Sequence, residues 1–383
     1  MALADRAAAR PDPERLPKRL RQLDGILRAK GITLDELEAA SVRSVGFWQA
    51  MHKDEAGDAV ITDLARIEFA PSWETGPEWP VIQPGPAVVK APKPARKRTR
   101  KWQTAVVLPD MQIGYWWGPD GELVPTHDEA ALSVARAIIR DAQPDLIVMH
   151  GDNADFPELS RYRLTPTFQR TTQATIDRCT ILAADLRADA PGARIIWLAG
   201  NHEERLQNYV MDNAAAAFGL KRGCDTSAWP VLSMPNLCRF DESRVEFLPG
   251  YPANCYWIND KLRVIHGNIA RKGGVAHHYL DDARVSTLYG HVHRAERAER
   301  TRTTRDGPRT VLAASAGCLA RIDGAVPSTK GGYDLDGQPL VSYEDWQQGL
   351  FVIPFQPGDG EFALEHVQIL DGWAMWRGQE YAS

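Results

Sequence analysis

The amino-acid sequence predicts an α/β fold, on the basis of three observations. Short apolar runs at residues 105–108, 146–149 and 195–198 are bounded by turn residues, as buried strands are. Helical patterns separate these runs, and strand–helix–strand successions form parallel, right-handed crossovers. The chain has 383 residues, 44% hydrophobic and 25% charged, which suffices for one large globular domain and a smaller accessory part.

Two short helices are predicted near the N-terminus. The leucines of the first share one face of an amphipathic helix; they are Leu16, Leu20, Leu23 and Leu27. Gly31 is a plausible end, and Thr33 with Glu36 has the form of a capping box that would begin the second helix. The pair allows a helix-turn-helix interpretation, but acidic residues at the start of the second helix would repel phosphates. A small helical bundle or docking element is therefore the favoured interpretation.

The segment after these helices predicts a division of the chain. Residues 47–82 hold several tryptophans and prolines and a strand-like run at 67–70, which indicates an irregular flap or small sheet. Residues 84–101 begin with prolines and end in a basic cluster, the composition of an extended linker. The cluster could attract a phosphate backbone or be merely solvated. We expect a mainly helical accessory segment at 1–80, a Pro-rich basic linker at 81–101 and the main domain at 102–383.

Further elements of the main domain follow from local signals. Thr126 and Glu129 have the spacing of a capping box, which predicts a helix that ends near Pro144. A later helix is expected to bury Cys179, Leu182 and Leu186. Asp306 and Gly307 have the form of a hairpin turn between two strands. Closing strands are expected at residues 350–353 and 362–367.

Polar side chains recur where the strand-like runs stop, the position at which open α/β sheets place their sites. Five groups follow in order along the chain: Asp110 and Gln112; Asp152 and Asp155; Asn201 and His202; His266; His291 and His293. One such group would be weak evidence, because short motifs recur by chance, but five in order with the same context are strong. Carboxylates, amides and imidazoles without thiolates suit hard or borderline divalent cations.

In this order the groups resemble the motifs of the calcineurin-like metallophosphoesterase superfamily, D-x-H, GD-x-x-D, GNH-[DE], H and GH-x-H. The resemblance extends from about residue 101 to the last strands. It implies an α/β fold in which two mixed β-sheets pack as a sandwich flanked by helices (αββα). One position departs from the pattern, because Gln112 stands where the family usually has histidine. The chain most resembles the D-x-Q variants encoded by bacteriophages and prophages.

The resemblance implies two divalent metal ions that share one carboxylate. The first ion would be bound by Asp110, Gln112, Asp152 and His293. The second would be bound by Asp152, Asn201, His266 and His291. A shared anion makes two dications about 3.5–4 Å apart tolerable, and such a pair lowers the pKa of a bridging water. Mn²⁺ is expected, because an amide is a weaker donor than imidazole; Mg²⁺, Fe, Zn²⁺ and Co²⁺ are alternatives.

Two further residues are implied to act on the substrate. By the resemblance, His202 is not a ligand but faces the phosphate, where it would stabilise the transition state or protonate the leaving oxygen. Asp155 would orient His202 and hold its tautomer. His150 is expected to support the ligands, and Glu203 and Glu204 to cap or pair at a helix start.

The expected reaction is hydrolysis of a phosphodiester bond, with DNA as the leading substrate. Residues that follow the motifs could contact a nucleic acid; they are Arg161, Tyr162, Arg163, Arg170, Arg271, Lys272, His278 and Arg294. The resemblance to phage-encoded enzymes, and more distantly to recombination nucleases, points the same way. A phosphomonoesterase or small-nucleotide phosphodiesterase is one alternative. A DNA- or protein-binding phage factor with a vestigial metal site is the other.

Charge and hydropathy limit the other classes of function. A net charge of −5 argues against a uniformly basic nucleic-acid-binding surface. Apolar runs fall short of the ~20 residues that cross a bilayer, and the first residues lack the layout of a signal peptide. We therefore expect a cytoplasmic protein, in the host cytoplasm if it is phage-encoded, without a membrane partner. The oligomeric state stays open, with a homodimer among the possibilities.

Overall fold

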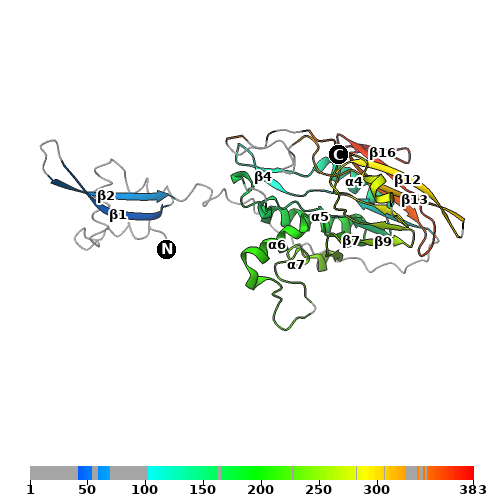
Figure 1. Ribbon diagram of the computed structural model, residues 1–383, viewed down its shortest axis with the longest axis horizontal. Helices are drawn as coiled ribbons and strands as arrows, with labels where there is room; N and C mark the ends of the chain where they lie inside the picture. Colours follow the sequence, from blue (N-terminus) through cyan, green and yellow to red (C-terminus); the bar gives the residue numbers. More distant parts are fainter. Residues whose placement is uncertain are drawn as a thin grey trace. The chain divides into compact units, whose positions relative to one another are not determined.

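The computed structural model describes residues 42–53, 59–69, 102–161, 165–226, 228–281, 283–305, 307–324, 334–335, 340 and 343–383. The chain divides into two units, residues 1–87 and 88–383. In the first unit, β1 (Val42–Lys53) and β2 (Ala59–Phe69) pair in antiparallel register (Figure 1). The helices expected before residue 41 and the basic linker lie outside the described residues, so the expected division into three parts stays a prediction.

An eight-stranded mixed sheet forms the base of the second unit, in the order β17-β16-β15-β14-β3-β6-β7-β8. Its parallel half consists of β3 (Gln103–Leu108), β6 (Leu146–Met149), β7 (Arg194–Leu198) and β8 (Val245–Leu248). Its antiparallel half consists of β14 (Gln348–Phe355), β15 (Glu365–Leu370), β16 (Trp373–Trp376) and β17 (Gln379–Ala382). The three apolar runs that predicted parallel strands are therefore adjacent strands of one sheet.

A second, five-stranded sheet has the order β12-β13-β11-β10-β9. Its strands are β9 (Tyr256–Asn259), β10 (Leu262–Val264), β11 (Ser286–Leu288), β12 (Ala295–Thr304) and β13 (Gly307–Ala316). The predicted hairpin is confirmed, because β12 and β13 pair in antiparallel register up to Thr304 opposite Gly307; Asp306 lies outside the described residues. A separate small pair is formed by β4 (Tyr115–Trp117) and β5 (Leu123–Pro125).

Alternating side chains of the large sheet enter two different apolar cores. Val107 and Val148 pack with Val264 and Leu288 of the five-stranded sheet, so the two sheets form a sandwich. The intervening residues, such as Ile147, pack instead with helices α4 (Glu129–Ala142) and α5 (Thr172–Asp189). Helix α9 (Val275–Asp281) packs on the five-stranded sheet in a third core. The layers are therefore helix, sheet, sheet and helix, as expected from the resemblance.

The remaining elements join these layers. They are α6 (Glu203–Asn213), α7 (Met234–Leu237), α8 (Phe240–Ser243) and the 3₁₀ turns η3 (Pro157–Leu159), η4 (Pro166–Phe168) and η5 (Ala215–Ala217). As predicted, α5 buries Cys179, Leu182 and Leu186. Within the described residues, no helix combines the length and the apolar character needed to cross a membrane.

Two predicted boundaries were wrong. Helix α4 is capped by Asp128, whose Oδ1 accepts from the backbone N–H groups of Ala130 and Ala131, and not by Thr126. The hydroxyl of Thr126 donates instead to the backbone oxygen of Gln112, because the loop after β3 folds back over it. The last predicted strand begins at Glu365 rather than at residue 362, since Phe362 forms only an isolated bridge with Phe355.

We expect Asp128→Ala to lower the free energy of unfolding by about 1–2 kcal/mol, because it removes the acceptor of two N–H groups in the first turn of α4. Urea unfolding followed by circular dichroism measures this loss. Asp128→Asn is the matched control, since asparagine also caps helices well. Equal losses in the two variants would contradict the assignment of the cap.

Candidate metal centre

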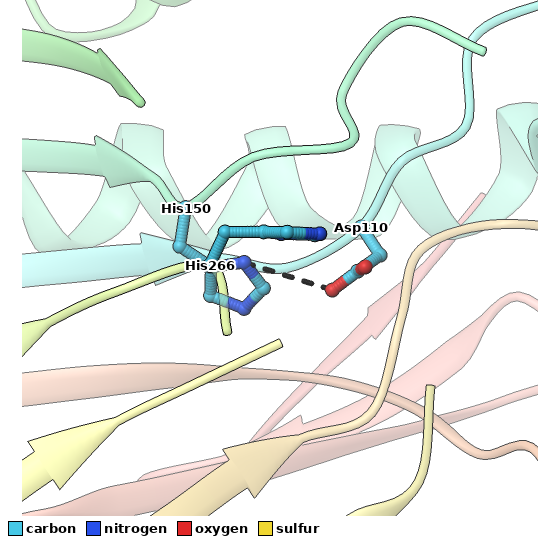
Figure 2. A group of neighbouring side chains, drawn as sticks. All are labelled: Asp110, His150 and His266. Carbon is cyan, nitrogen blue, oxygen red and sulfur yellow. Dashed lines mark ion pairs between the residues drawn. The ribbon is translucent and has the colours of Figure 1, made fainter. Parts of the chain in front are cut away.

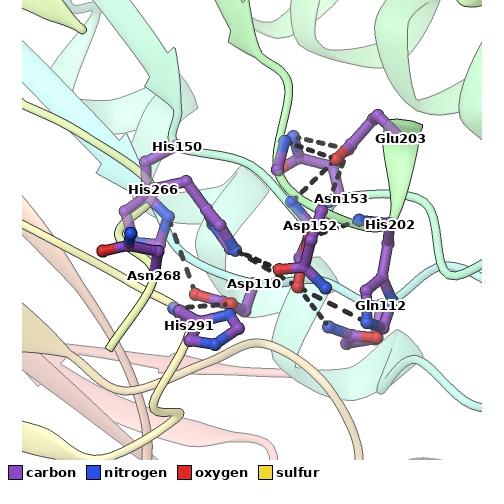
Figure 3. A network of polar contacts seen from close by, with 12 residues as sticks. Asp110, Gln112, His150, Asp152, Asn153, His202, Glu203, His266, Asn268 and His291 are labelled. Atoms are coloured by element: carbon purple, nitrogen blue, oxygen red, sulfur yellow. Dashed lines mark hydrogen bonds and ion pairs between the residues drawn. The ribbon is translucent and has the colours of Figure 1, made fainter. Parts of the chain in front are cut away.

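The order of the strands brings the predicted site residues together. Asp110, Asp152 and Asn201 follow the carboxyl ends of β3, β6 and β7, which are parallel neighbours, so these side chains meet at one edge of the large sheet. His266 and His291 follow β10 and β11, which are parallel neighbours in the other sheet. Figure 3 shows Asp110, Asp152, His266 and His291 pointing toward one another.

The four residues expected around the first ion form a chain of contacts. Nε2 of His293 lies 3.2 Å from Oδ1 of Asp110 and 3.4 Å from Nε2 of Gln112. The same amide nitrogen of Gln112 lies 3.4 Å from Oδ2 of Asp152. All four residues are buried.

The residues expected around the second ion also gather around Asp152, and the same oxygen, Oδ2, is contacted from this side. Nε2 of His266 lies 3.2 Å from Oδ2 of Asp152 and 3.1 Å from Oδ1 of Asn201. Candidate ligand atoms of Asp152, His266 and His291 all lie within 4.8 Å of one another. Asp152 therefore touches both sets of residues, as a bridging carboxylate must, and the individual ligand roles stay predictions.

Buried polar atoms without a partner show that these residues fit a cation. Oδ2 of Asp110 and Oε1 of Gln112 are buried and accept no hydrogen bond. Such atoms are rare in folded proteins and commonly mark an ion or a water. The groups that surround them are carboxylates, amides and imidazoles, a donor set for hard or borderline divalent metals. A half-turn of the Gln112 amide would direct its oxygen, a possible ligand, toward Asp152 and His293.

Backbone conformation sets the direction of several of these side chains. Gln112, Asp152, His291 and His293 all have positive φ, between 49° and 69°. Non-glycine residues rarely adopt this left-handed region, which costs about 1–3 kcal/mol each and is concentrated at functional sites. Four of the seven predicted ligands are therefore held in a strained conformation by their surroundings.

His150 lies beside the ligands, as expected, and forms a second group with two of them. Its side chain is 2% exposed, and its Nδ1 atom lies 3.6 Å from Oδ2 of Asp110. Candidate ligand atoms of Asp110, His150 and His266 also lie within 4.8 Å of one another (Figure 2). Burial lowers the pKa of His150 to about 4, although Asp110 partly opposes this, so the ring is neutral near pH 7.

The carboxylate of Glu203 holds the two central loops in place. Its Oε2 accepts from the backbone N–H groups of Asp152 and Gly200, at 2.9 and 2.8 Å. Its Oε1 accepts from the N–H groups of Asn153 and Ala154 and from Nε1 of Trp197, among other donors. The sequence suggested only a role at a helix start. The local sequence carries no signal for this role, because Glu203 stands among the polar residues His202, Glu204 and Arg205.

His202 and Asp155 are adjacent, as the expected orienting role requires. Nδ1 of His202 lies 2.7 Å from Oδ1 of Asp155. Arg205, which the motifs did not single out, donates to the same oxygen at 3.0 Å. Burial alone would raise the pKa of Asp155, but His202 and Arg205 hold it below its usual value. Asp155 is therefore an anion near neutral pH.

Neighbouring charges also set the protonation states of Asp152 and His266. Burial would raise the pKa of Asp152, yet His202 and His266 hold it well below the usual value. Burial would lower the pKa of His266, yet Asp152 raises it to about 9. Without a metal, His266 thus carries a proton that balances the carboxylate.

The residues expected to contact substrate are less concentrated. Tyr162 and Arg163 lie outside the described residues, while Arg161 is exposed just before them. The backbone N–H of Arg170 donates to Glu158 at 2.7 Å. Arg294 is engaged, because its Nε atom pairs with Glu296 at 3.0 Å and its Nη2 atom donates to the backbone of Arg271. Lys272 and His278 are exposed. Their contacts with substrate stay predictions.

Two aromatic residues beside the centre were missed. The ring of Tyr251 lies 5.6 Å from that of His266, and the ring of Trp346 lies 4.3 Å from that of His293. Both are partly exposed. Neither follows a motif, so only their position in the fold reveals them.

Comparisons with known proteins find solved structures that resemble this chain. The sequence matches no family model and no curated protein. A purple acid phosphatase isolated from yellow lupin (Lupinus luteus) seeds is similar over 86% of this chain, at 11% sequence identity and a TM-score of 0.32. The match spans 58% of the lupin chain.

We expect Glu203→Gln to weaken Mn²⁺ binding by about 10- to 100-fold, because an amide has one acceptor atom and cannot replace both Oε2, which accepts from Asp152 and Gly200, and Oε1, which accepts from Asn153 and Ala154. Isothermal titration calorimetry of the metal-free protein measures the affinity. Glu204→Gln, one residue further along α6, is the matched control. Equal Mn²⁺ affinities in the two variants would refute this role of Glu203.

Mn²⁺ affinity should also increase as the pH rises from 6 to 9. The pKa of about 9 means that His266 is protonated in the metal-free protein over this range, and it must lose that proton to coordinate. The affinity should fall by up to about tenfold for each pH unit below 9 per proton released. Titrations at several pH values test this, and an affinity independent of pH between 7 and 9 would show the expectation to be wrong.

Proposed function

We propose that the protein is a dinuclear-metal-dependent phosphoesterase that hydrolyses phosphodiester bonds, with DNA as the leading substrate. The observation that carries the proposal is the position of Asp152, whose Oδ2 lies 3.4 Å from Gln112 and 3.2 Å from His266. These two residues belong to different ligand sets, so one carboxylate can serve two cations. Strain and unpartnered polar atoms at the same residues support a metal centre.

The residues around Asp152 have distinct tasks in this proposal. Asp110, Gln112, Asp152 and His293 would hold one ion, and Asp152, Asn201, His266 and His291 the other. Bound there, divalent ions supply Lewis acidity that activates water and neutralises the charge of the phosphate, and Mn²⁺ is the proposed metal. His202 lies on the opposite side of Asp152 from His291 in Figure 3, where it can stabilise or protonate the leaving oxygen. Asp155 orients His202 through the 2.7 Å contact with Nδ1.

A nucleic-acid ester is favoured by the aromatic rings beside the centre. Tyr251 and Trp346 flank histidines of the two different ligand sets and are partly exposed. Aromatic side chains stack on nucleobases, with a stabilisation of about 1–3 kcal/mol for each base. The exposed Lys272 could attract the phosphate backbone.

The Mn²⁺-loaded protein is expected to hydrolyse single- or double-stranded DNA and a chromogenic phosphodiester faster than a chromogenic monoester. Removal of metal with EDTA should abolish the activity, and Mn²⁺ should restore it. His202→Ala should lower kcat by about 10²- to 10⁴-fold. His277→Ala, an exposed histidine of α9, is the control that should leave kcat unchanged.

The outcomes separate the alternatives. Hydrolysis of the monoester alone would reject the phosphodiesterase and favour a phosphomonoesterase. A protein that binds DNA but hydrolyses none of the esters in the presence of Mn²⁺ would favour a binding factor with a vestigial metal site. Steady-state rates together with metal analysis of the purified protein distinguish these cases.

A further inference from the structure

The guanidinium group of Arg205, in the first turn of α6, contacts Asp155 and His202. These are the two residues proposed to act on the substrate beside the metal ions. The Nη1 atom of Arg205 donates to the backbone oxygen of Asp155 at 2.6 Å and to the Oδ1 atom at 3.0 Å. Its Nη2 atom lies 2.8 Å from Nε2 of His202. The motifs assign no task to this residue.

The contact with His202 uses the ring nitrogen that should face the substrate. Nδ1 of His202 is directed to Asp155, so Nε2 is the nitrogen on the side of the centre, 3.6 Å from Oδ2 of Asp152. A guanidinium group has donors only, so Nε2 is the acceptor in this contact. Nη2 of Arg205 therefore places an N–H donor at the edge of the metal centre, where Nε2 of His202 accepts it.

The surroundings of Arg205 suit an anion that arrives from solvent. Its side chain is 16% exposed, whereas the side chains of Asp155 and His202 are 2% and 7% exposed. Nη1 of Arg205 is paired with Asp155, which also contacts His202, whereas Nη2 meets a ring nitrogen and not a second carboxylate. The planar fork of donors in arginine matches phosphoryl oxygens in geometry. Arg294, by contrast, already has Glu296 and a backbone oxygen as acceptors.

We propose that Arg205 binds a non-bridging phosphoryl oxygen of the substrate through Nη2, and that its contact with His202 is a resting contact that the phosphoryl oxygen replaces. Nη1 stays on Asp155 throughout, which keeps the guanidinium in place. Nε2 of His202 is then released from Arg205. This assignment rests on the proposed phosphoesterase function and adds a substrate-binding residue to it.

The test compares binding of inorganic phosphate by full-length protein loaded with Mn²⁺. Arg205→Met removes the charge and the donors, Arg205→Lys keeps the charge without the fork, and Arg140→Met removes a half-exposed arginine of α4 as the control. We expect phosphate affinity to fall by about 10- to 100-fold in Arg205→Met, with an intermediate loss in Arg205→Lys and none in Arg140→Met. KM for the diester should rise in parallel, and the Mn²⁺ stoichiometry should not change.

Two results would overturn the proposal. If Arg205→Met lowers kcat but keeps the phosphate affinity of the wild type, Arg205 only positions His202 and Asp155. If Arg205→Met does not fold, Arg205→Lys decides through the same affinity, and an unchanged value refutes the assignment. Failure of the proposed function is distinguishable, because the wild-type protein itself would then hydrolyse no phosphodiester.

Discussion

The site depends on a concentration of buried negative charge that the fold must compensate. Asp110, Asp152, Asp155 and Glu203 are each at most 2% exposed and lie in the loops after β3 and β6 and at the start of α6. An unpaired carboxylate in such surroundings would be strongly destabilising. Glu203 is compensated by N–H donors from two loops, and Asp155 by His202 and Arg205. Asp110 and Asp152 each accept one backbone N–H group, from His291 and His202, and otherwise face imidazoles and, in the proposed function, cations.

The compensation of Glu203 has a structural effect beyond charge. Burial and the nearby Asp152 raise the pKa of Glu203, while hydrogen bonds from the backbone of Gly200 and Asn153 oppose the shift. Those same bonds fix the loops after β6 and β7 relative to each other. Strained residues need such restraints, because a left-handed backbone at Gln112 or Asp152 persists only where the surroundings determine it. The rigid loops thus direct the side chains toward a common point before any ion binds.

Much of this architecture could be predicted from the sequence. Short apolar runs predicted the strands, and the polar residues directly after them predicted the site. The runs before Asp110, Asp152 and Asn201 are buried on both faces, which makes parallel strands recognisable. The roles of Glu203 and Arg205 could not be predicted, since each depends on partners from the loop after β6, about 50 residues away. Tyr251 and Trp346 were missed for the same reason. The cap of α4 was misplaced because Thr126 has the right spacing but is held by Gln112.

The predicted ligands come from two different layers of the sandwich. Asp110, Gln112, Asp152 and Asn201 follow strands of the eight-stranded sheet, whereas His266, His291 and His293 follow strands of the five-stranded sheet. An ion bound by ligands from both sheets would link the two layers at one end of their shared apolar core. Because such binding occurs only when both layers are in place, metal occupancy and cohesion of the sandwich are thermodynamically linked. The same cations would then contribute both to catalysis and to the stability of the fold.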